Sequence, residues 1–270
     1  MFGSSRESLA GLRTAVQSTR SAADFRSSAS QVLAAAGVLA AEKSLRQTLA
    51  DAGTASVARI ALAESVFAGT MAATSMDVLR QAIAVRWSSD ADFVEAVETL
   101  GIQMLCIAAQ EADALGAVEE ELFLFGRAIA SSAHLQMTLT DPALSSDAKA
   151  VVVTTLLAGR GNEVTTELLA HTVTNLRGKR LDAAIDALIE VAADQRNRLV
   201  AQVVSAIALD TQQSDRLKAA LSSLTGRDIN VNAVVDPGVG GGISVRIGDD
   251  LIDGTVANRM ASARRQLLND

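Results

Sequence analysis

The chain has 270 residues and a formal net charge of −7, and 49% of its residues are hydrophobic. Aromatic residues make up only 3%, with two prolines and no tyrosine, a composition typical of packed α-helices with small contact residues. The acidic balance argues against nucleic acid and against anionic lipid as partners, because both bind basic surfaces.

The single cysteine and the hydropathy pattern indicate in which compartment the chain resides and whether it enters a membrane. Cys106 has no second cysteine to pair with, which fits a reducing compartment, and its apolar neighbours predict a buried, inert thiol. Residues 4–30 are rich in Ser and Arg and lack the apolar core of a secretory signal. The longest nearly apolar run, residues 32–41, is far shorter than the roughly 18 residues that a membrane span needs. We therefore expect no direct membrane insertion.

An internal repeat occupies the first two thirds of the chain. Residues 45–69 align without gaps on residues 135–159, an offset of 90, with eight identical pairs. Beyond this stretch the match continues with one extra residue in the second copy, so that Arg86 faces Arg177. Each copy has the size of a small helical bundle.

Local signals predict helices in both copies. Ser89 with Asp92 three residues later resembles a capping box before an apolar helix. Asp141-Pro142 followed by two serines predicts a turn that leads into another helix start. Residues 181–199 carry an apolar stripe at helical spacing.

The pattern changes to a small α/β module after about residue 198. The predicted elements are a strand at 200–209, a helix at 211–224, strands at 228–235 and 243–247, a tight turn at 248–250, and a last helix at 255–268. Thr211 or Ser214 is expected to cap the first of these helices, and Gly226 to end it.

The glycine run at 238–242 invites comparison with nucleotide-binding loops. A dinucleotide fingerprint needs G-x-G-x-x-G at the start of a helix, but Ile243 takes the place of the last glycine and the following residues resemble a strand. The Gly-Lys-Ser/Thr of a phosphate loop is missing as well. We therefore predict a glycine turn or bulge between strands, with no cofactor.

Other polar groups predict no catalytic or metal site. His134 and His171 lack neighbouring zinc ligands, and no serine lies in a nucleophile elbow. Residues 119–121, all Glu, are interpreted as acids in the first turn of a helix, with one edge of a groove for a partner helix as the alternative. The basic run 177–180 is interpreted as a solvated loop, with a contact to an acidic partner as the alternative.

Residues 234–268, VVDPGVGGGISVRIGDDLIDGTVANRMASARRQLL, closely resemble the C-terminal signature of the delta subunit of F-type ATP synthase, called OSCP in mitochondria. That pattern runs Asp-Pro, Gly-Gly, a strand with a basic residue, Gly-Asp, an apolar pair, Asp-Gly-Ser, and a helix with Arg. The matching positions, which the resemblance makes candidates for structural or interface roles, are Asp236, Pro237, Gly241, Gly242, Arg246, Gly248, Asp249, Ile252, Asp253, Gly254 and Arg259. Thr255 replaces the usual Ser. The resemblance covers roughly residues 112–270.

The repeat and the helix and strand patterns predict a mainly α fold of two related helical bundles followed by a small C-terminal α/β module. Residues 1–108 are expected to form an extra bundle, 109–199 a bundle of the ordinary N-terminal type, and 200–270 a stalk-binding module. Ordinary family members have one bundle, so the duplication resembles actinobacterial delta subunits in particular.

The function that the resemblance implies is that of a non-catalytic peripheral-stalk, or stator, subunit. It would link the alpha subunits of the catalytic head, with beta subunits as further candidates, to the b-type stalk subunits. In this way it would resist rotor torque during proton-driven ATP synthesis at the cytoplasmic face of the cell membrane. We expect the second copy, which adjoins the C-terminal module, to cap the head. The alternatives are a general helical scaffold or adaptor, and a nucleotide-binding enzyme that uses the glycine run.

Overall fold

The structure is a computed structural model that divides into two compact units, residues 1–196 and 197–270. It describes residues 3–18, 25–157, 161–197, 199–225, 229–236, 239, 241–247, 250–253 and 255. Helices dominate the described residues, so the predicted mainly α fold with a small C-terminal α/β region is confirmed.

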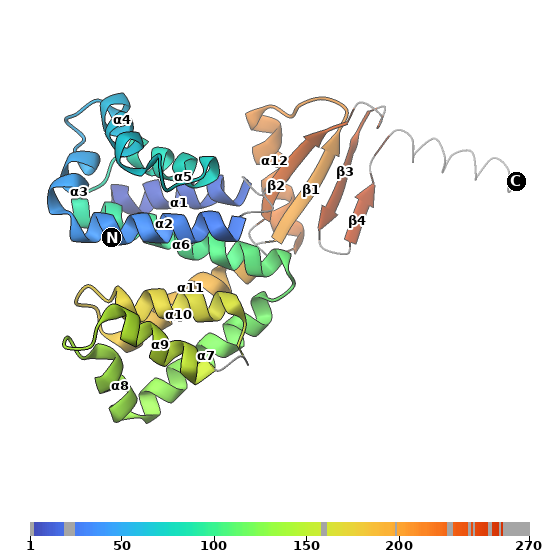
Figure 1. Cartoon of the computed structure of the whole chain (residues 1–270). Coiled ribbons are helices and arrows are strands. Elements are labelled where there is room, and N and C mark those ends of the chain that lie inside the picture. The colour runs from blue at the N-terminus through green and yellow to red at the C-terminus, as the bar shows by residue number, and fades with distance from the viewer. Residues whose placement is uncertain are drawn as a thin grey trace, which may run out of the picture. The chain divides into compact units, whose positions relative to one another are not determined.

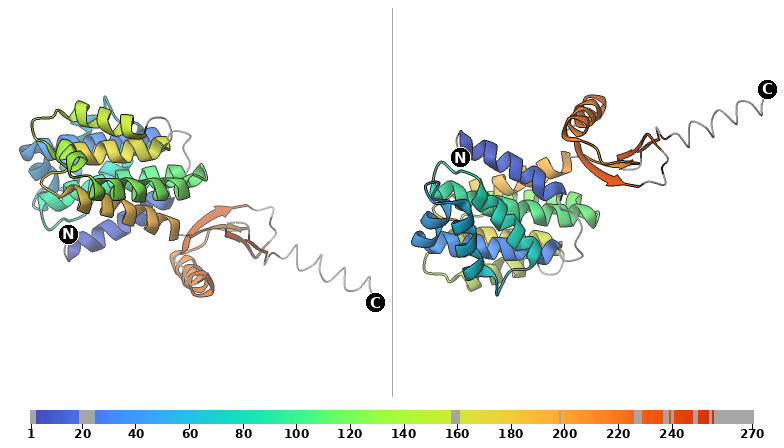
Figure 2. Two further views of the ribbon diagram at one scale, coloured as in Figure 1. Left: turned by 90° about the horizontal axis from the view of Figure 1, so that it is seen from below. Right: turned by 90° about the horizontal axis from the view of Figure 1, so that it is seen from above.

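The first unit is built from helices alone in the part of it that the structure describes (Figure 1). The helices are α1 (Ser4–Ser18), α2 (Phe25–Ala41), α3 (Lys43–Ala50), α4 (Ser56–Phe67), α5 (Ala73–Ala84), α6 (Asp90–Glu111), α7 (Leu115–Ser131), α8 (Ala133–Thr140), α9 (Ser146–Leu157), α10 (Glu163–Thr174) and α11 (Leu181–Asn197). Their inward faces form one continuous hydrophobic core. The right-hand view of Figure 2 shows the blue and teal helices α1–α5 in front of the green and yellow helices of the second copy.

The repeat is visible in the helix boundaries. Helices α2 to α5 and α7 to α10 have pairwise equal lengths of 17, 8, 12 and 12 residues, and each pair starts 90 residues apart. Helices α6 and α11 start 91 residues apart, so the extra residue of the second copy lies between α10 and α11. At the offset of 90, α1 corresponds to residues 94–108, which lie inside α6. Helix α6 thus stands at the end of the first copy and at the start of the second.

Side-chain hydrogen bonds repeat at the same offset. In each copy one side chain, on α2 or on α7, accepts two hydrogen bonds from the start of a later helix, α5 or α10. One bond comes from the backbone N–H of the residue before that helix, and the other from a hydroxyl in the first turn of that helix. The bonds are those to Gln31 Oε1 from Ala72 N (2.7 Å) and Ser75 Oγ (2.6 Å), and those to Glu121 Oε2 from Asn162 N (2.9 Å) and Thr165 Oγ1. The two copies therefore share packing detail as well as helix order.

The predicted helix starts at Ser89 and after Asp141 are confirmed. Ser89 precedes α6, and its Oγ accepts a hydrogen bond from the backbone N–H of Asp92 at 3.0 Å. Ser145 precedes α9, and its Oγ accepts one from the N–H of Ala148 at 3.2 Å. Each bond satisfies an N–H that has no partner within the helix.

The second unit contains a four-stranded sheet with one described helix against it. The elements are β1 (Leu199–Ser205), α12 (Thr211–Thr225), β2 (Ile229–Val235), β3 (Ile243–Ile247) and β4 (Asp250–Asp253), and the strand order is β2-β1-β3-β4. Strands β1 and β2 are parallel, which requires the crossover that α12 supplies, whereas β3 is antiparallel to both β1 and β4. Figure 2 shows α12 against one face of the sheet. Val203, Leu221, Ile229 and Val245 form the small core between them.

The predicted cap of α12 is wrong. Asp210, and not Thr211 or Ser214, precedes the helix: its Oδ1 accepts from the N–H of Gln213 at 2.7 Å. The side chain of Gln213 accepts in return from the N–H of Asp210 at 3.0 Å, which completes a capping box. The expected stop at Gly226 and the last helix beyond Thr255 lie outside the described residues.

Candidate interaction surfaces

The glycine run lies between β2 and β3. Gly241 and Gly242 have φ angles of +129° and +79°, in the region that favours glycine, and strand β3 begins directly afterwards at Ile243. Because a strand follows, this turn lacks the helix N-terminus on which a dinucleotide fingerprint depends. The structure thus agrees with a glycine turn between strands.

The other signature positions are placed only in part. Asp236 follows β2, is exposed, and donates its backbone N–H to Ser205 O at 2.9 Å. Arg246 is exposed on β3, next to the buried Val245, and so projects from the sheet face opposite α12. Asp253 ends β4 opposite Ser244.

Ile252 is 45% exposed on β4. Pro237, Gly248, Asp249, Gly254 and Arg259 lie outside the described residues. Interface roles for the signature positions therefore stay predictions.

A buried carboxylate joins α6 to α10 and to the turn after it. Glu98 Oε1 lies 3.1 Å from His171 Nε2, and the guanidinium of Arg177 bonds the other oxygen. Burial works against ionisation of Glu98, but the hydrogen bond from His171 and the positive charge of Arg177 outweigh it and lower the pKa of Glu98 from 4.5. His171 therefore contacts a carboxylate within the fold.

The basic run 177–180 is held against α6. Arg177 and Gly178 adopt φ angles of +47° and +79°, and this turn brings Lys179 Nζ within 3.0 Å of Glu95 Oε1. With Arg177 on Glu98, two of the basic side chains contact acids of α6. Residues 177–180 are all exposed, in agreement with the solvated-loop interpretation, and two of them also pair with acids of the same chain.

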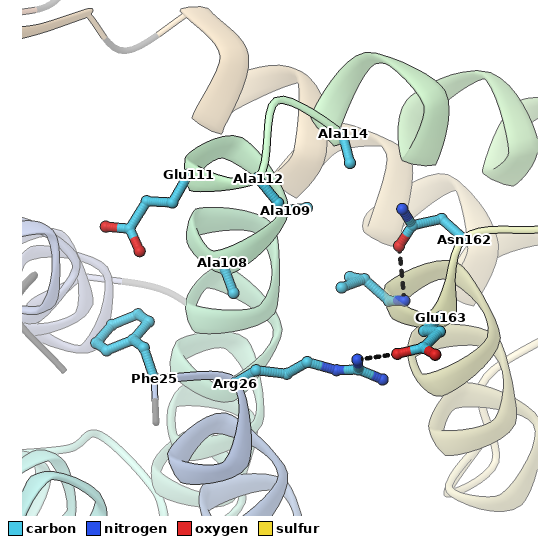
Figure 3. Close-up of a pocket in the computed structure, with 10 residues that line it drawn as sticks. Phe25, Arg26, Ala108, Ala109, Glu111, Ala112, Ala114, Asn162 and Glu163 are labelled. Atoms are coloured by element: carbon cyan, nitrogen blue, oxygen red, sulfur yellow. Dashed lines mark hydrogen bonds and ion pairs between the residues drawn. The ribbon is translucent and has the colours of Figure 1, made fainter. Parts of the chain in front are cut away.

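A charged cluster also links α2 of the first copy to α10 of the second. Arg26 bonds Glu163 and Glu167, and Ser30 bonds Glu167. Figure 3 shows Arg26 extended toward Glu163 at the edge of a cavity of about 520 Å³, with alanines of α6 along its wall. Sequence reasoning missed this cluster, because each charge lies about 140 residues from its partner and carries no local signal.

The three acids at 119–121 do not lie in the first turn of their helix. Helix α7 begins at Leu115, so the first-turn interpretation is wrong, and each acid has its own surroundings. Glu119 pairs with Arg196 at 2.9 Å, and Glu121 accepts the bonds that fix the start of α10. Glu120 is exposed.

An apolar hollow lies beside these acids. A cavity of about 300 Å³ is lined by Glu121, Leu124 and Phe125 of α7, Leu135 of α8 and Leu156 of α9. Phe123 and Leu124 are each 54% exposed, and Leu156 is 51% exposed. Leu124 and Leu156, which line the hollow, thus leave apolar surface exposed beside α7.

The remaining sequence predictions concern single side chains and the membrane. Cys106 is fully buried, as predicted, and burial raises the pKa of its thiol to about 12. Across the described ranges, no helix is both long and apolar enough to cross a membrane.

The described residues thus show ion pairs between the two helical copies, exposed apolar side chains and two compact units. Comparison with known proteins identifies the class of this protein. The family model for the ATP synthase delta (OSCP) subunit matches residues 103–267, beginning inside α6.

Curated relatives match the chain over nearly its whole length. ATP synthase subunit delta of Parafrankia sp. is 38% identical, with 99% of both chains covered. The subunits of Streptomyces griseus and Nocardia farcinica are 37% and 39% identical, with 99% of this chain and 99% and 100% of theirs covered. The chain belongs to the ATP synthase delta (OSCP) subunit family and is a non-catalytic subunit of the ATP synthase complex. These matches include the duplicated helical half of this chain.

Proposed function

We propose that this subunit links the catalytic head of ATP synthase to its b-type stalk subunits and holds the head against rotor torque. The observation that carries the proposal is family membership over nearly the whole chain. The division into two units supports it, because a linker between two bodies needs a separate binding surface for each.

The helical unit is the part that we assign to the head. Its second copy is the one that the family model matches, starting at residue 103, so this copy takes the ordinary head-capping position on the alpha subunits. The exposed apolar hollow beside α7 supports this assignment, since it offers a helix-binding surface on that copy.

The C-terminal unit is the part that we assign to the b-type subunits. Asp236 and Arg246 are exposed signature residues in this unit and supply charges for such a contact. Bound between the head and the b-type subunits, the chain is a peripheral component of the complex at the cytoplasmic face of the cell membrane.

A depletion and add-back experiment tests the function. When this subunit is removed, the head should leave the membrane and still hydrolyse ATP in solution, whereas the stripped membranes should make no ATP from a proton gradient. Adding the full chain should restore proton-driven synthesis and retain the head on the membrane. If stripped membranes synthesise ATP at the original rate, the chain is no stator; if the chain binds no ATP synthase subunit, it is a scaffold elsewhere.

A further inference from the structure

One hollow of the helical unit is lined by basic side chains from both copies. It has a volume of about 320 Å³ and is bordered by the end of α2, the start of α3, the first turns of α6 and the turn between α10 and α11. Its charged lining residues are Arg46, Glu95, Arg177 and Lys179, and two alanines and a valine line the rest. We call this site the basic hollow. Two members of the basic run 177–180 thus meet a cation of the first copy.

The groups that line the basic hollow carry an excess of positive charge. Arg46, Arg177 and Lys179 supply three cations, and Glu95 is the one acid among the described residues that line it, so the lining charge is three minus one, or +2. The whole chain, by contrast, has a formal net charge of −7. A concave surface that gathers charges of one sign concentrates their field, and this one therefore attracts an anion.

Ion pairs with acids outside the basic hollow fix its two arginines. Arg46 donates from Nε to Asp90 Oδ2 at 2.9 Å and from Nη1 to the backbone O of Ala40 at 2.8 Å. Arg177 bonds Glu98 through Nη2. A guanidinium carries five N–H donors, so these bonds leave donors on both side chains. Because only 24% and 26% of the two side chains is exposed, their positions are set before a ligand binds.

The turn between α10 and α11 adds the third cation. Arg177 has a φ angle of +47°, which is unusual for a residue other than glycine, and contacts with α6 hold the turn in this shape. Lys179 donates its backbone N–H to Leu176 O at 2.8 Å, and its Nζ lies 3.0 Å from Glu95 Oε1. The side chain of Lys179 is 44% exposed, so a ligand in the hollow can reach it from solvent.

We propose that the basic hollow binds a phosphate group, either of inorganic phosphate or of a nucleotide. A phosphate group carries about 1.5–2 negative charges near pH 7, which matches the lining charge of +2. It offers three oxygens, to which Arg46 donates from α3, and Arg177 and Lys179 donate from the turn. Arginine bonds phosphate through paired N–H groups and lysine acts as a point charge. A single carboxylate has one charge and two oxygens, so it fits this lining less well.

The bound phosphate connects the two helical copies. Arg46 belongs to the first copy, Arg177 and Lys179 to the second, and Glu95 to the helix that both copies share. Binding therefore fastens α3 and the turn before α11 to each other and stabilises the helical unit by mass action. The site lies within the isolated chain, so its existence does not depend on the proposed stator function.

Titration calorimetry on the full chain tests the site. Inorganic phosphate, ADP and ATP are titrated separately, and adenosine serves as the probe that lacks a phosphate group. Sodium chloride holds the ionic strength constant, so that exposed charges are screened equally in every titration. We expect one saturable site for the phosphate-bearing probes and no binding of adenosine. Equal affinity for phosphate and ATP would identify free phosphate as a sufficient ligand, and tighter binding of ATP would assign the site to a nucleotide.

Two substitutions and a matched control locate the site. Arg46→Gln and Lys179→Gln should each weaken binding about 10-fold, because each removes one charged hydrogen bond. Gln136 is the counterpart of Arg46 in the second copy, so the helix accepts glutamine at this position. The control is Arg180→Gln, since Arg180 belongs to the same basic run but pairs with Asp182 and does not line the hollow. This control should leave the affinity unchanged, and circular dichroism verifies that each variant is folded.

Three results would overturn the proposal. The first is a full chain that binds neither inorganic phosphate nor the nucleotides. The second is an equal loss of affinity in Arg180→Gln and Lys179→Gln, which would show diffuse attraction by the whole basic run. The third is binding of adenosine as tight as that of ATP, since the phosphate would then contribute nothing. Lys179→Arg retains the charge and should bind phosphate nearly as well as the unchanged chain.

Discussion

Helices α2 and α6 pack tightly against each other at Gly101, and replacing this glycine tests that packing. A Cβ atom at position 101 would lie 2.7 Å from Leu33 Cδ2, 2.8 Å from its Cγ and 3.3 Å from its backbone N. Leu33 is only 4% exposed, so it has little room to move. Alanine normally stabilises a helix by about 1 kcal/mol relative to glycine, but overpacking costs about 1–3 kcal/mol. We expect Gly101→Ala to lower the free energy of unfolding by about 1 kcal/mol.

The chain supplies its own control for this substitution. Gly11 in α1 is the counterpart of Gly101 at the offset of 90, is exposed, and has no atom within 4 Å of the position that a Cβ would take. Gly11→Ala should therefore raise the free energy of unfolding by up to about 1 kcal/mol. The two Gly→Ala substitutions should thus change the free energy of unfolding in opposite directions, and their effects should differ by about 2 kcal/mol.

Urea denaturation followed by tryptophan fluorescence measures the difference. Trp87 is the single tryptophan of the chain, is 8% exposed, and belongs to the helical unit, so its emission reports on that unit alone. In the Gly101→Ala background, Leu33→Ala should cost about 2 kcal/mol less than the roughly 2–5 kcal/mol expected otherwise, because it also removes the overpacking. Equal stabilisation by Gly101→Ala and Gly11→Ala would refute the close approach of the two helices.

Three further substitutions or treatments follow from single contacts. Glu98→Gln should lower the free energy of unfolding at pH 7 by about 2 kcal/mol, because Arg177 and His171 lose a buried charged partner. Since the folded pKa of Glu98 is below 4.5, the stabilisation that this carboxylate provides is present above that pH and lost as the pH falls below it. In urea titrations between pH 7 and 3, the free energy of unfolding should therefore decline more steeply for the unchanged chain than for Glu98→Gln. Ser89→Ala should cost about 1 kcal/mol in the same assay, because α6 loses its cap, and no loss would contradict the capping bond. Cys106 should react with a thiol reagent only in urea, and rapid reaction of the native chain would contradict its burial.

The helices were predictable wherever short-range chemistry determines them. Ser89 and Asp141 mark helix boundaries through hydrogen bonds to residues two or three positions away, so the sequence contains the whole interaction. The start of α7 carries no such signal: Ala114 precedes it without a side-chain cap, and the acids that follow were taken for its first turn. The predicted caps of α12, Thr211 and Ser214, lie one and four residues after the observed cap, because Asp, Thr and Ser are all favoured caps and stand close together there.

The interaction surfaces were predictable only in part, since burial depends on distant residues. Leu33 and Phe123 occupy equivalent positions on equivalent helices, yet one is 4% exposed and the other 54%. The two side chains differ in exposure because of their neighbours: Gly101 lies beside Leu33, and residues of the second copy lie beyond it. The sequence around each residue contains no information about such distant neighbours. The alternative interpretation of residues 119–121 as one edge of a groove came closer, since Glu121 lines the hollow beside α7.

The double role of α6 bears on how the duplicated half can serve a stator. Two bundles joined by a flexible linker would add a hinge between the head and the stalk, and a hinge would absorb torque. Here the last helix of the first copy continues without a break as the first helix of the second, and both copies share one hydrophobic core. Ion pairs from Arg26 to α10 and from Arg177 and Lys179 to α6 fasten the copies on either side of that helix. The extra copy therefore enlarges a single stiff body within the helical unit.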